Sequence, residues 1–133
     1  ERFQGCLDAA KAAGVPCSAS IINAETPPEE IHSMVEQSLS EKTLVFVPNC
    51  WLLPKIFQAL APLHVQIPER LGVLGFDNEE WAGFSVPSVS TIVQPAFQEG
   101  ATAAALLIDN IRSKPNIPAN ATLDCEIVLR GST

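Results

Sequence analysis

The chain contains the stretch Arg70-Leu71-Gly72-Val73-Leu74-Gly75-Phe76-Asp77-Asn78, followed after a loop by Thr91-Ile92-Val93-Gln94-Pro95. The apolar run over residues 71–76 is short and continuous, which is typical of a strand buried on both faces. It ends in a carboxylate and an amide side chain, so it delivers polar groups at its carboxyl end. Open α/β sheets bind ligands at this end of their strands. The junction after Phe76 is therefore the first candidate site.

The overall composition restricts the class of protein. With 133 residues and 47% hydrophobic content, the chain is about one domain in size and is able to bury a core. Its formal net charge is −7 and its few basic residues are scattered, so it lacks the cationic surface that DNA binding requires. No apolar run approaches the roughly 20 residues of a membrane span, and the first residues do not resemble a signal peptide. We therefore expect a cytoplasmic protein that contacts neither nucleic acid nor membrane through this chain.

The cysteines form no recognisable metal or redox motif. Cys6, Cys17, Cys50 and Cys125 include no C-x-x-C pair, and no paired histidines accompany them. The sequence therefore predicts buried thiols in a reducing compartment.

Two short motifs resemble functional signatures but lack the structural context of those signatures. Gly72 and Gly75 lie inside the predicted strand rather than in a turn before a helix, which argues against dinucleotide binding. Gly83-Phe84-Ser85 matches only the first part of a nucleophile elbow and lies in a proline-bearing loop. The sequence therefore predicts no enzyme, no cofactor and no metal.

The rest of the chain predicts helices that alternate with strands. Apolar residues at helical spacing indicate helices over 2–13, 27–40 and 52–60, and a long helix between Pro95 and Pro115. Short β-branched runs indicate strands over 17–24, 43–47, 71–76 and 89–93. A Pro/Asn-rich loop over 113–121 precedes a half-buried edge strand over 122–130. This order favours an α/β fold, with a mostly parallel sheet flanked by helices and right-handed crossovers.

Several polar residues have a structural interpretation. Thr26 opens a capping-box pattern, and Asn49 is suited to be the N-cap of the helix that follows it. Pro54 lies near the start of that helix, so the helix should begin one or two residues late. His32 lies beside an apolar stripe without an obvious partner and is interpreted as structural.

The loop over residues 78–88 is unusually apolar, because it contains Trp81, Phe84 and Val86. Exposed aromatic and aliphatic side chains in a loop mark an interface. A loop that folds onto the core of its own chain explains the same residues equally well. The residues alone leave both interpretations open.

A set of polar residues points to a ligand class. Asn49 and Asp77 follow predicted strands, and Arg2 lies in the first turn of a predicted helix, where the helix dipole disfavours a cation. Arg2 is therefore either a solvated surface residue or has another function. Amide, carboxylate and guanidinium groups suit vicinal hydroxyls, since each pairs with two adjacent O–H groups. A polyol or sugar acid is the natural ligand for this set.

Five segments carry a resemblance to a known family. Arg2-Phe3-Gln4-Gly5-Cys6 resembles an R-x-x-G-[FW] start, Asn49 an N-D strand end, and Leu71-Gly72-Val73-Leu74-Gly75-Phe76-Asp77-Asn78 a V-G-[FY]-D-D segment. Pro87-Ser88-Val89-Ser90-Thr91-Ile92-Val93-Gln94-Pro95 resembles P-x-L-T-T-[VI]-x-Q-[PD], and Leu129-Arg130-Gly131-Ser132-Thr133 resembles a terminal R-[GE]-S-T. Together they resemble the LacI/GalR family of bacterial repressors, whose effector domain has the periplasmic-binding-protein-like type I fold.

The resemblance implies a domain organisation. The chain is similar to about the C-terminal half of such an effector domain. Residues 1–88 and 122–133 would form the C-terminal lobe, and residues 89–121 would supply a crossover strand and helix to the N-terminal lobe. The DNA-binding headpiece, the hinge helix and most of the N-terminal lobe would lie outside this sequence.

The resemblance also implies site residues. Arg2, Asn49 and Asp77 correspond to groups that bind effector hydroxyls, and Gln94 corresponds to a residue that lines the cleft at the crossover. The implied homodimer interface in the C-terminal lobe consists of Leu53, Ile56, Phe57, Trp81, Phe84 and Val86.

Two positions depart from the family pattern. Thr26 stands where the family often has an aromatic residue that stacks on a sugar ring, and Cys50 replaces the usual aspartate after the asparagine. A sugar acid or sugar phosphate paired with Arg2 is therefore an alternative effector.

The expected function is that of the ligand-sensing domain of a LacI-type transcriptional regulator. It would bind a sugar or sugar-derived effector, dimerise, and contact operator DNA only through the missing headpiece. The alternative is a sugar-binding solute receptor of a transporter with the same fold. An α/β hydrolase is a third class, for which the sequence shows neither a nucleophile nor a base.

Overall fold

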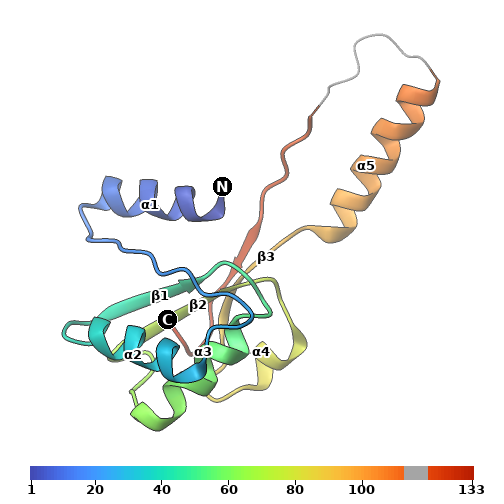
Figure 1. Cartoon of the computed structure of the whole chain (residues 1–133). Coiled ribbons are helices and arrows are strands. Elements are labelled where there is room, and N and C mark those ends of the chain that lie inside the picture. The colour runs from blue at the N-terminus through green and yellow to red at the C-terminus, as the bar shows by residue number, and fades with distance from the viewer. Residues whose placement is uncertain (113–119) are drawn as a thin grey trace.

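The structure, a computed structural model, describes residues 1–112 and 120–133. The helices are α1 (Arg2–Ala13), α2 (Pro28–Ser38), α3 (Leu53–Leu60), the 3-10 helix η1 (Ala61–Leu63), α4 (Glu80–Phe84) and α5 (Ala96–Ile111). The strands are β1 (Thr43–Val47), β2 (Leu71–Phe76), β3 (Ser90–Val93) and β4 (Glu126–Val128). Figure 1 shows their arrangement.

The strands form one sheet in the order β1-β2-β3-β4. The pairs β1/β2 and β2/β3 are parallel, and β4 runs antiparallel to β3 at the edge. Five of the six residues of β2 are buried, as its continuous apolar sequence predicts. The predicted α/β fold with a mostly parallel sheet is confirmed.

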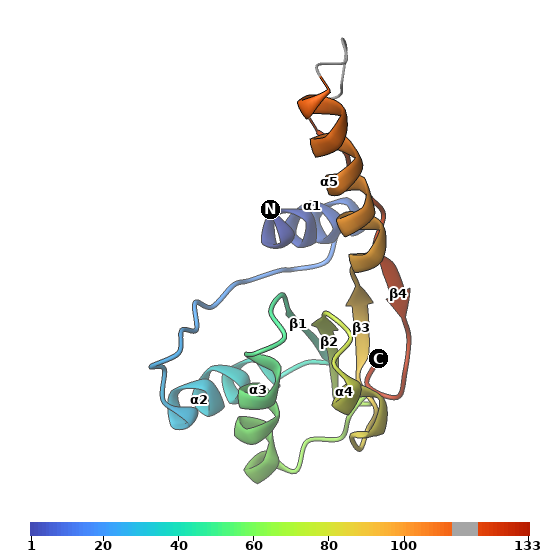
Figure 2. The same ribbon diagram turned by 90° about the vertical axis from the view of Figure 1, so that its right-hand side faces the viewer.

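The core lies on one face of the sheet, where α2 and α3 pack (Figure 2). Ile31 of α2 and Leu71 and Val73 of β2 are fully buried there. His32 Nδ1 lies 3.1 Å from the carbonyl oxygen of Ala59, which joins α2 to α3 and confirms its structural interpretation.

Gly75 leaves space on β2 for a core side chain. A Cβ atom added at Gly75 would lie 2.8 Å from Cδ2 of Leu53, which is only 2% exposed and therefore held by its neighbours. A Cβ atom added at Gly72 would lie equally close to Cδ1 of Leu44, but Leu44 is 59% exposed and is free to turn away. Gly75 therefore has a packing role that Gly72 lacks.

Gly75→Ala should destabilise the protein by about 1–3 kcal/mol, because the added methyl overpacks an immobile side chain. Gly72→Ala is the matched control and should change the free energy of unfolding by less than about 0.5 kcal/mol. Urea denaturation of both variants checks the difference. Equal destabilisation by both substitutions would contradict this interpretation.

The predicted strand over residues 17–24 is wrong. The segment is irregular, Ile21 is 92% exposed, and no described strand pairs with the outer edge of β1. Apolar residues without a hydrogen-bonding neighbour do not make a strand. In place of strand pairing, the backbone N–H groups of Glu25 and Thr26 donate to the side chain of Asn23.

Both predicted N-caps are also wrong. Pro27 is the N-cap of α2, while Thr26 Oγ1 accepts a hydrogen bond from the backbone N–H of Asn23 at 3.0 Å. Leu52 is the N-cap of α3, while Asn49 Oδ1 accepts one from the backbone N–H of Trp51 at 3.3 Å. In each case the side chain stabilises a local turn before the helix. The predicted late start of α3 is confirmed, since Pro54 lies in its first turn.

Other differences concern exposed segments. The predicted loop over 78–88 contains the short helix α4, and β4 is shorter than predicted and mostly exposed. The four thiols are not buried as predicted, since Cys6 and Cys50 are half-buried and Cys17 and Cys125 are exposed. The predicted helix stop at Pro115 and most of the predicted loop over 113–121 lie outside the described residues. Within residues 1–112 and 120–133, no helix is long and apolar enough to cross a membrane.

The last residues of the chain form hydrogen bonds with β2 and with the start of β3. Ser132 is fully buried: its Oγ accepts a hydrogen bond from the Ser90 N–H at 2.8 Å and donates one to the Val73 carbonyl at 2.6 Å. The Val73 N–H donates to the Ser132 carbonyl at 2.7 Å. Arg130 donates to the Val89 carbonyl at 2.6 Å and to Asn78 Oδ1 at 2.7 Å. We call residues 130–133 the C-terminal clamp.

Candidate functional site

The candidate site lies where the three parallel strands end. Asn49 follows β1, Asp77 follows β2 and Gln94 follows β3. Parallel strands end at one edge of a sheet, so these residues come from neighbouring positions. Helix α1 lies beyond this edge in Figures 1 and 2, and Arg2 reaches back from its first turn.

Arg2 contacts the strand ends rather than its own helix. Its Nη1 donates to the Pro48 carbonyl at 2.9 Å, and its Nη2 donates to Gln94 Oε1 at 3.4 Å. The guanidinium carbon lies 3.7 Å from the centroid of the Phe76 ring, a cation–π geometry. No carboxylate lies within ion-pair distance of Arg2 among the described residues. These contacts explain a cation at a position that the helix dipole disfavours.

Gln94 joins Arg2 to Asp77. Its Oε1 accepts from Arg2, and its Nε2 donates a short hydrogen bond to Asp77 Oδ1. Asp77 itself has φ 69°, in the left-handed region that aspartate tolerates better than most residues, and its N–H donates to the Ile92 carbonyl at 2.8 Å. The turn after β2 therefore fixes the position of the carboxylate.

Cys50 completes the group beside Asp77. Burial is the main cause that raises the pKa of the Cys50 thiol, and its hydrogen bond to Asp77 and the charge of that carboxylate raise the pKa further. The thiol therefore stays protonated beside the carboxylate. Asn49 is half-buried, and its side chain accepts the Trp51 N–H.

The structure thus brings Arg2, Gln94 and Asp77 into one hydrogen-bonded chain, with Asn49 next to Pro48. Sequence reasoning missed Phe76 and Pro48. Phe76 is the last residue of β2. Its contact with Arg2 follows from the alternation of side chains along the strand, once Arg2 is known to lie beside that strand. Pro48 contributes a backbone carbonyl, for which a sequence holds no signal.

The residues of the expected dimer interface fall into two groups. Leu53 and Ile56 are 2% and 3% exposed and belong to the core of this chain, so they leave the candidate interface. Phe57 and Trp81 are half-buried and pack edge to face, with ring centroids 6.2 Å apart. Phe84 and Val86 are 74% and 96% exposed. The apolar loop therefore folds partly onto its own core and partly faces outward.

The chemistry of the strand-end site is that of hydrogen bonding. It offers a guanidinium, a carboxylate, amides and a neutral thiol. No group of three or more His, Cys, Asp or Glu side chains that could hold a metal occurs in the part of the chain that the structure describes. A ligand rich in hydroxyl groups suits such a set.

Comparison with known proteins identifies the class and then the family. The model of the family described as periplasmic binding protein-like domain matches residues 1–133. The HTH-type transcriptional repressor PurR of Yersinia pestis bv. Antiqua (strain Antiqua) is 31% identical over 135 residues, covering 98% of this chain and 40% of PurR. The chain belongs to the periplasmic-binding-protein-like domain family, and its relatives are LacI-family transcriptional regulators, not enzymes.

Solved structures agree with this assignment. A putative transcription regulation repressor of the LacI family from Corynebacterium glutamicum has a TM-score of 0.83 and 26% identity, and the match covers 98% of this chain and 51% of that one. A LacI family transcriptional regulator from Enterococcus faecium with bound ribose has a TM-score of 0.74 and 25% identity, covering 99% and 50%. The chain spans about half the length of these structures and less than half of the curated relative above.

Proposed function

We propose that this chain is the C-terminal part of the effector-sensing domain of a cytoplasmic LacI-type regulator, and that it binds a sugar or sugar-derived effector. Arg2, Asn49, Asp77 and Gln94 are the proposed effector-binding residues. The observation that carries the proposal is the chain of contacts from Arg2 through Gln94 to Asp77 at the strand ends. The bound ribose of the Enterococcus faecium regulator supports a sugar as the ligand class.

Each proposed residue has a chemical role. The Asp77 carboxylate accepts hydrogen bonds from two adjacent hydroxyls, and the Arg2 guanidinium donates to ring or hydroxyl oxygens or to an acid group. Gln94 and Asn49 each offer a donor and an acceptor. The contacts between Gln94 and both charged groups hold their side chains in place before a ligand arrives, which lowers the entropy cost of binding.

The division into lobes is part of the proposal. Residues 1–88 and 122–133 form the C-terminal lobe, and residues 89–121 cross to the N-terminal lobe. The projection of α5 away from the sheet in Figure 1 supports this division, as does the exposure of Phe97 (89%) and Leu107 (61%) on its apolar face. An effector then shifts the equilibrium between lobe arrangements by its differential affinity for them. That shift would change how the DNA-binding headpiece, which is outside this chain, binds operator DNA.

A thermal-shift screen of the intact protein tests the proposal. The panel contains ribose, cellobiose, a hexonic acid, a hexuronic acid and a sugar phosphate, each in excess. A ligand at 100 times its Kd stabilises the folded state by about 2.7 kcal/mol, which raises the melting temperature measurably. A ligand whose shift survives the double substitution of Arg2 and Gln94 by alanine binds elsewhere and overturns the assignment. A panel without any shift overturns the ligand class.

The same proposal includes a homodimer. The candidate surface consists of the edge-to-face pair Phe57 and Trp81 together with exposed Phe84 and Val86. Clustered exposed aromatic and aliphatic groups at the centre of an interface contribute most of its binding energy.

Phe84→Asp combined with Val86→Asp should convert the dimer to a monomer while the fold is retained. Burying a carboxylate in an apolar interface costs on the order of several kcal/mol. Sedimentation equilibrium measures the change, with far-UV circular dichroism as the check of folding. Val15→Asp is the matched control, since Val15 is 57% exposed and outside the surface. A dimer of unchanged affinity would remove this surface from the interface.

A further inference from the structure

The turn after β2 holds Asp77 in an unusual backbone conformation. Its φ is 69°, in the left-handed region that residues other than glycine seldom adopt. A residue stays in this region only when the surrounding structure holds it there. The backbone N–H of Asp77 donates to the Ile92 carbonyl at 2.8 Å, which fixes the chain on the strand side of the turn. The next residue, Asn78, fixes it on the other side.

Asn78 is held by two residues from other parts of the chain. Its Oδ1 accepts a hydrogen bond from Arg130 Nη2 at 2.7 Å and a longer one from Thr91 Oγ1 at 3.4 Å. Arg130 Nη1 in turn donates to Thr91 Oγ1 at 3.0 Å. The three side chains therefore form a closed ring of hydrogen bonds directly after Asp77.

Arg130 is anchored to β3 and to the residue before it. Its Nη1 also donates to the Val89 carbonyl at 2.6 Å, and its backbone N–H donates to Ser90 Oγ at 2.7 Å. Thr91 is fully buried, so β3 sets the position of the ring. In Figure 2 the chain after β4 turns back toward the start of β3. Within residues 1–112 and 120–133, no carboxylate lies within ion-pair distance of Arg130, so its donors all serve neutral oxygens.

We propose that Arg130 is a positioning residue for the effector site. It holds Asn78, and Asn78 keeps the Asp77 carboxylate turned toward Gln94 and the effector. This inference rests on the proposed function of Asp77 as an effector ligand. Without the ring, Asp77 is free to relax to a negative φ, which moves its carboxylate away from the Gln94 amide that now donates to it. The affinity for the effector therefore depends on the C-terminal clamp.

The geometry requires an arginine rather than any cation at position 130. Its Nη1 serves Val89 and Thr91 while its Nη2 serves Asn78, so one planar group spans β3 and the turn after β2. A lysine ammonium is a compact charge on a flexible stem and does not reproduce this fork. Arg130→Lys therefore removes the positioning while it keeps the charge.

Calorimetry on the intact protein tests the inference. Asn78→Ala, at an exposed position, and Arg130→Lys should each raise the Kd roughly tenfold, with ribose or the panel sugar of largest thermal shift as the probe. Arg70→Lys is the matched control, because Arg70 donates to the carbonyls of Leu39 and Ser40 at the opposite end of β2. The control should leave the Kd within about twofold.

A double substitution separates positioning from direct contact with the sugar. In an Asp77→Ala background, Asn78→Ala should change the Kd by no more than about twofold, because it acts only through Asp77. A further loss of about tenfold in that background would overturn the inference. Unchanged affinity in both Asn78→Ala and Arg130→Lys, with Asp77→Ala weakened, would overturn it too. An unchanged Kd in Asp77→Ala overturns the proposed effector site instead.

Amide hydrogen exchange tests the positioning without any sugar. The N–H of Asp77 should exchange roughly tenfold faster in Asn78→Ala and in Arg130→Lys than in the wild-type protein, because the turn that protects it opens more often. Arg70→Lys should keep the wild-type rate at this amide. Equal rates in all four proteins would overturn the inference, whether or not a sugar of the panel binds.

Discussion

Asp77→Ala should weaken binding of the effector by about 2–3 kcal/mol, or roughly 30- to 160-fold in Kd. The loss is large because the substitution removes charged hydrogen bonds to the ligand. It also leaves the Gln94 amide without the carboxylate that holds it. Isothermal titration calorimetry on the intact protein, with the sugar that gives the largest thermal shift, measures the change.

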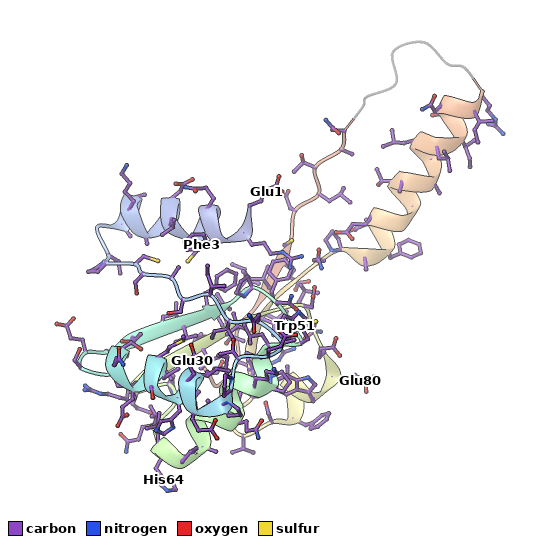
Figure 3. All side chains as sticks on the ribbon, viewed as in Figure 1. Glu1, Phe3, Glu30, Trp51, His64 and Glu80 are labelled. Atoms are coloured by element: carbon purple, nitrogen blue, oxygen red, sulfur yellow. The ribbon has the colours of Figure 1, made fainter. Side chains whose placement is uncertain are left out.

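Glu80→Ala is the control for the loss of a carboxylate. Glu80 is exposed in the first turn of α4, three residues after Asp77 in the sequence, and Figure 3 labels it at the edge of the molecule. The control should leave the Kd within about twofold, because an exposed charge away from the ligand contributes little. An unchanged Kd for Asp77→Ala would remove Asp77 from the site.

Ser132→Ala should lower the free energy of unfolding by about 2–4 kcal/mol. The substitution deletes a buried hydroxyl with two partners, so the N–H of Ser90 and the carbonyl of Val73 lose a hydrogen bond inside the protein. Each buried polar group left without a partner costs about 1–3 kcal/mol. The expected loss is therefore large for the removal of a single oxygen atom.

Urea denaturation followed by circular dichroism measures this loss. Ser40→Ala makes the same chemical change at an exposed position and should alter the free energy of unfolding by less than about 0.5 kcal/mol. If Ser132→Ala were as stable as the control, water would satisfy the two backbone groups and the C-terminal clamp would not stabilise the sheet.

The parallel strands could be predicted from sequence because their signal is local. Residues 43–47 and 71–76 are continuous apolar runs, and both form parallel strands. The predicted burial holds for β2, whereas only Val47 of β1 is buried. The segment over 17–24 has similar residues but lacks a pairing neighbour in the structure, and pairing is not encoded locally. Thr26 and Asn49 failed as caps for a related reason. Such side chains satisfy whichever backbone N–H the turn presents, and the turn is set by the chain around it.

The candidate site could be predicted in part. Asp77 and Gln94 follow strands, so their proximity follows from a parallel sheet. Gln94 entered as a site residue only through the resemblance to a family. Arg2 had already been grouped with Asn49 and Asp77, but a solvated surface residue was the alternative until the resemblance favoured a ligand. The contribution of Cys50 depends on its burial and on its proximity to Asp77, which only the structure provides. The terminal motif over residues 129–133 likewise had no structural explanation from sequence, because its role depends on hydrogen bonds to β2 and β3.

Helix α5 has a consequence for the order in which the protein becomes stable. An isolated helix of 16 residues is marginal in water, and α5 has no buried residue among those described. It therefore gains its stability only when its apolar face meets another surface, after the sheet and α2 and α3 have formed their core. During synthesis, α5 would remain a fluctuating element that samples helical turns, and docking of its partner surface would be the last cooperative step of folding.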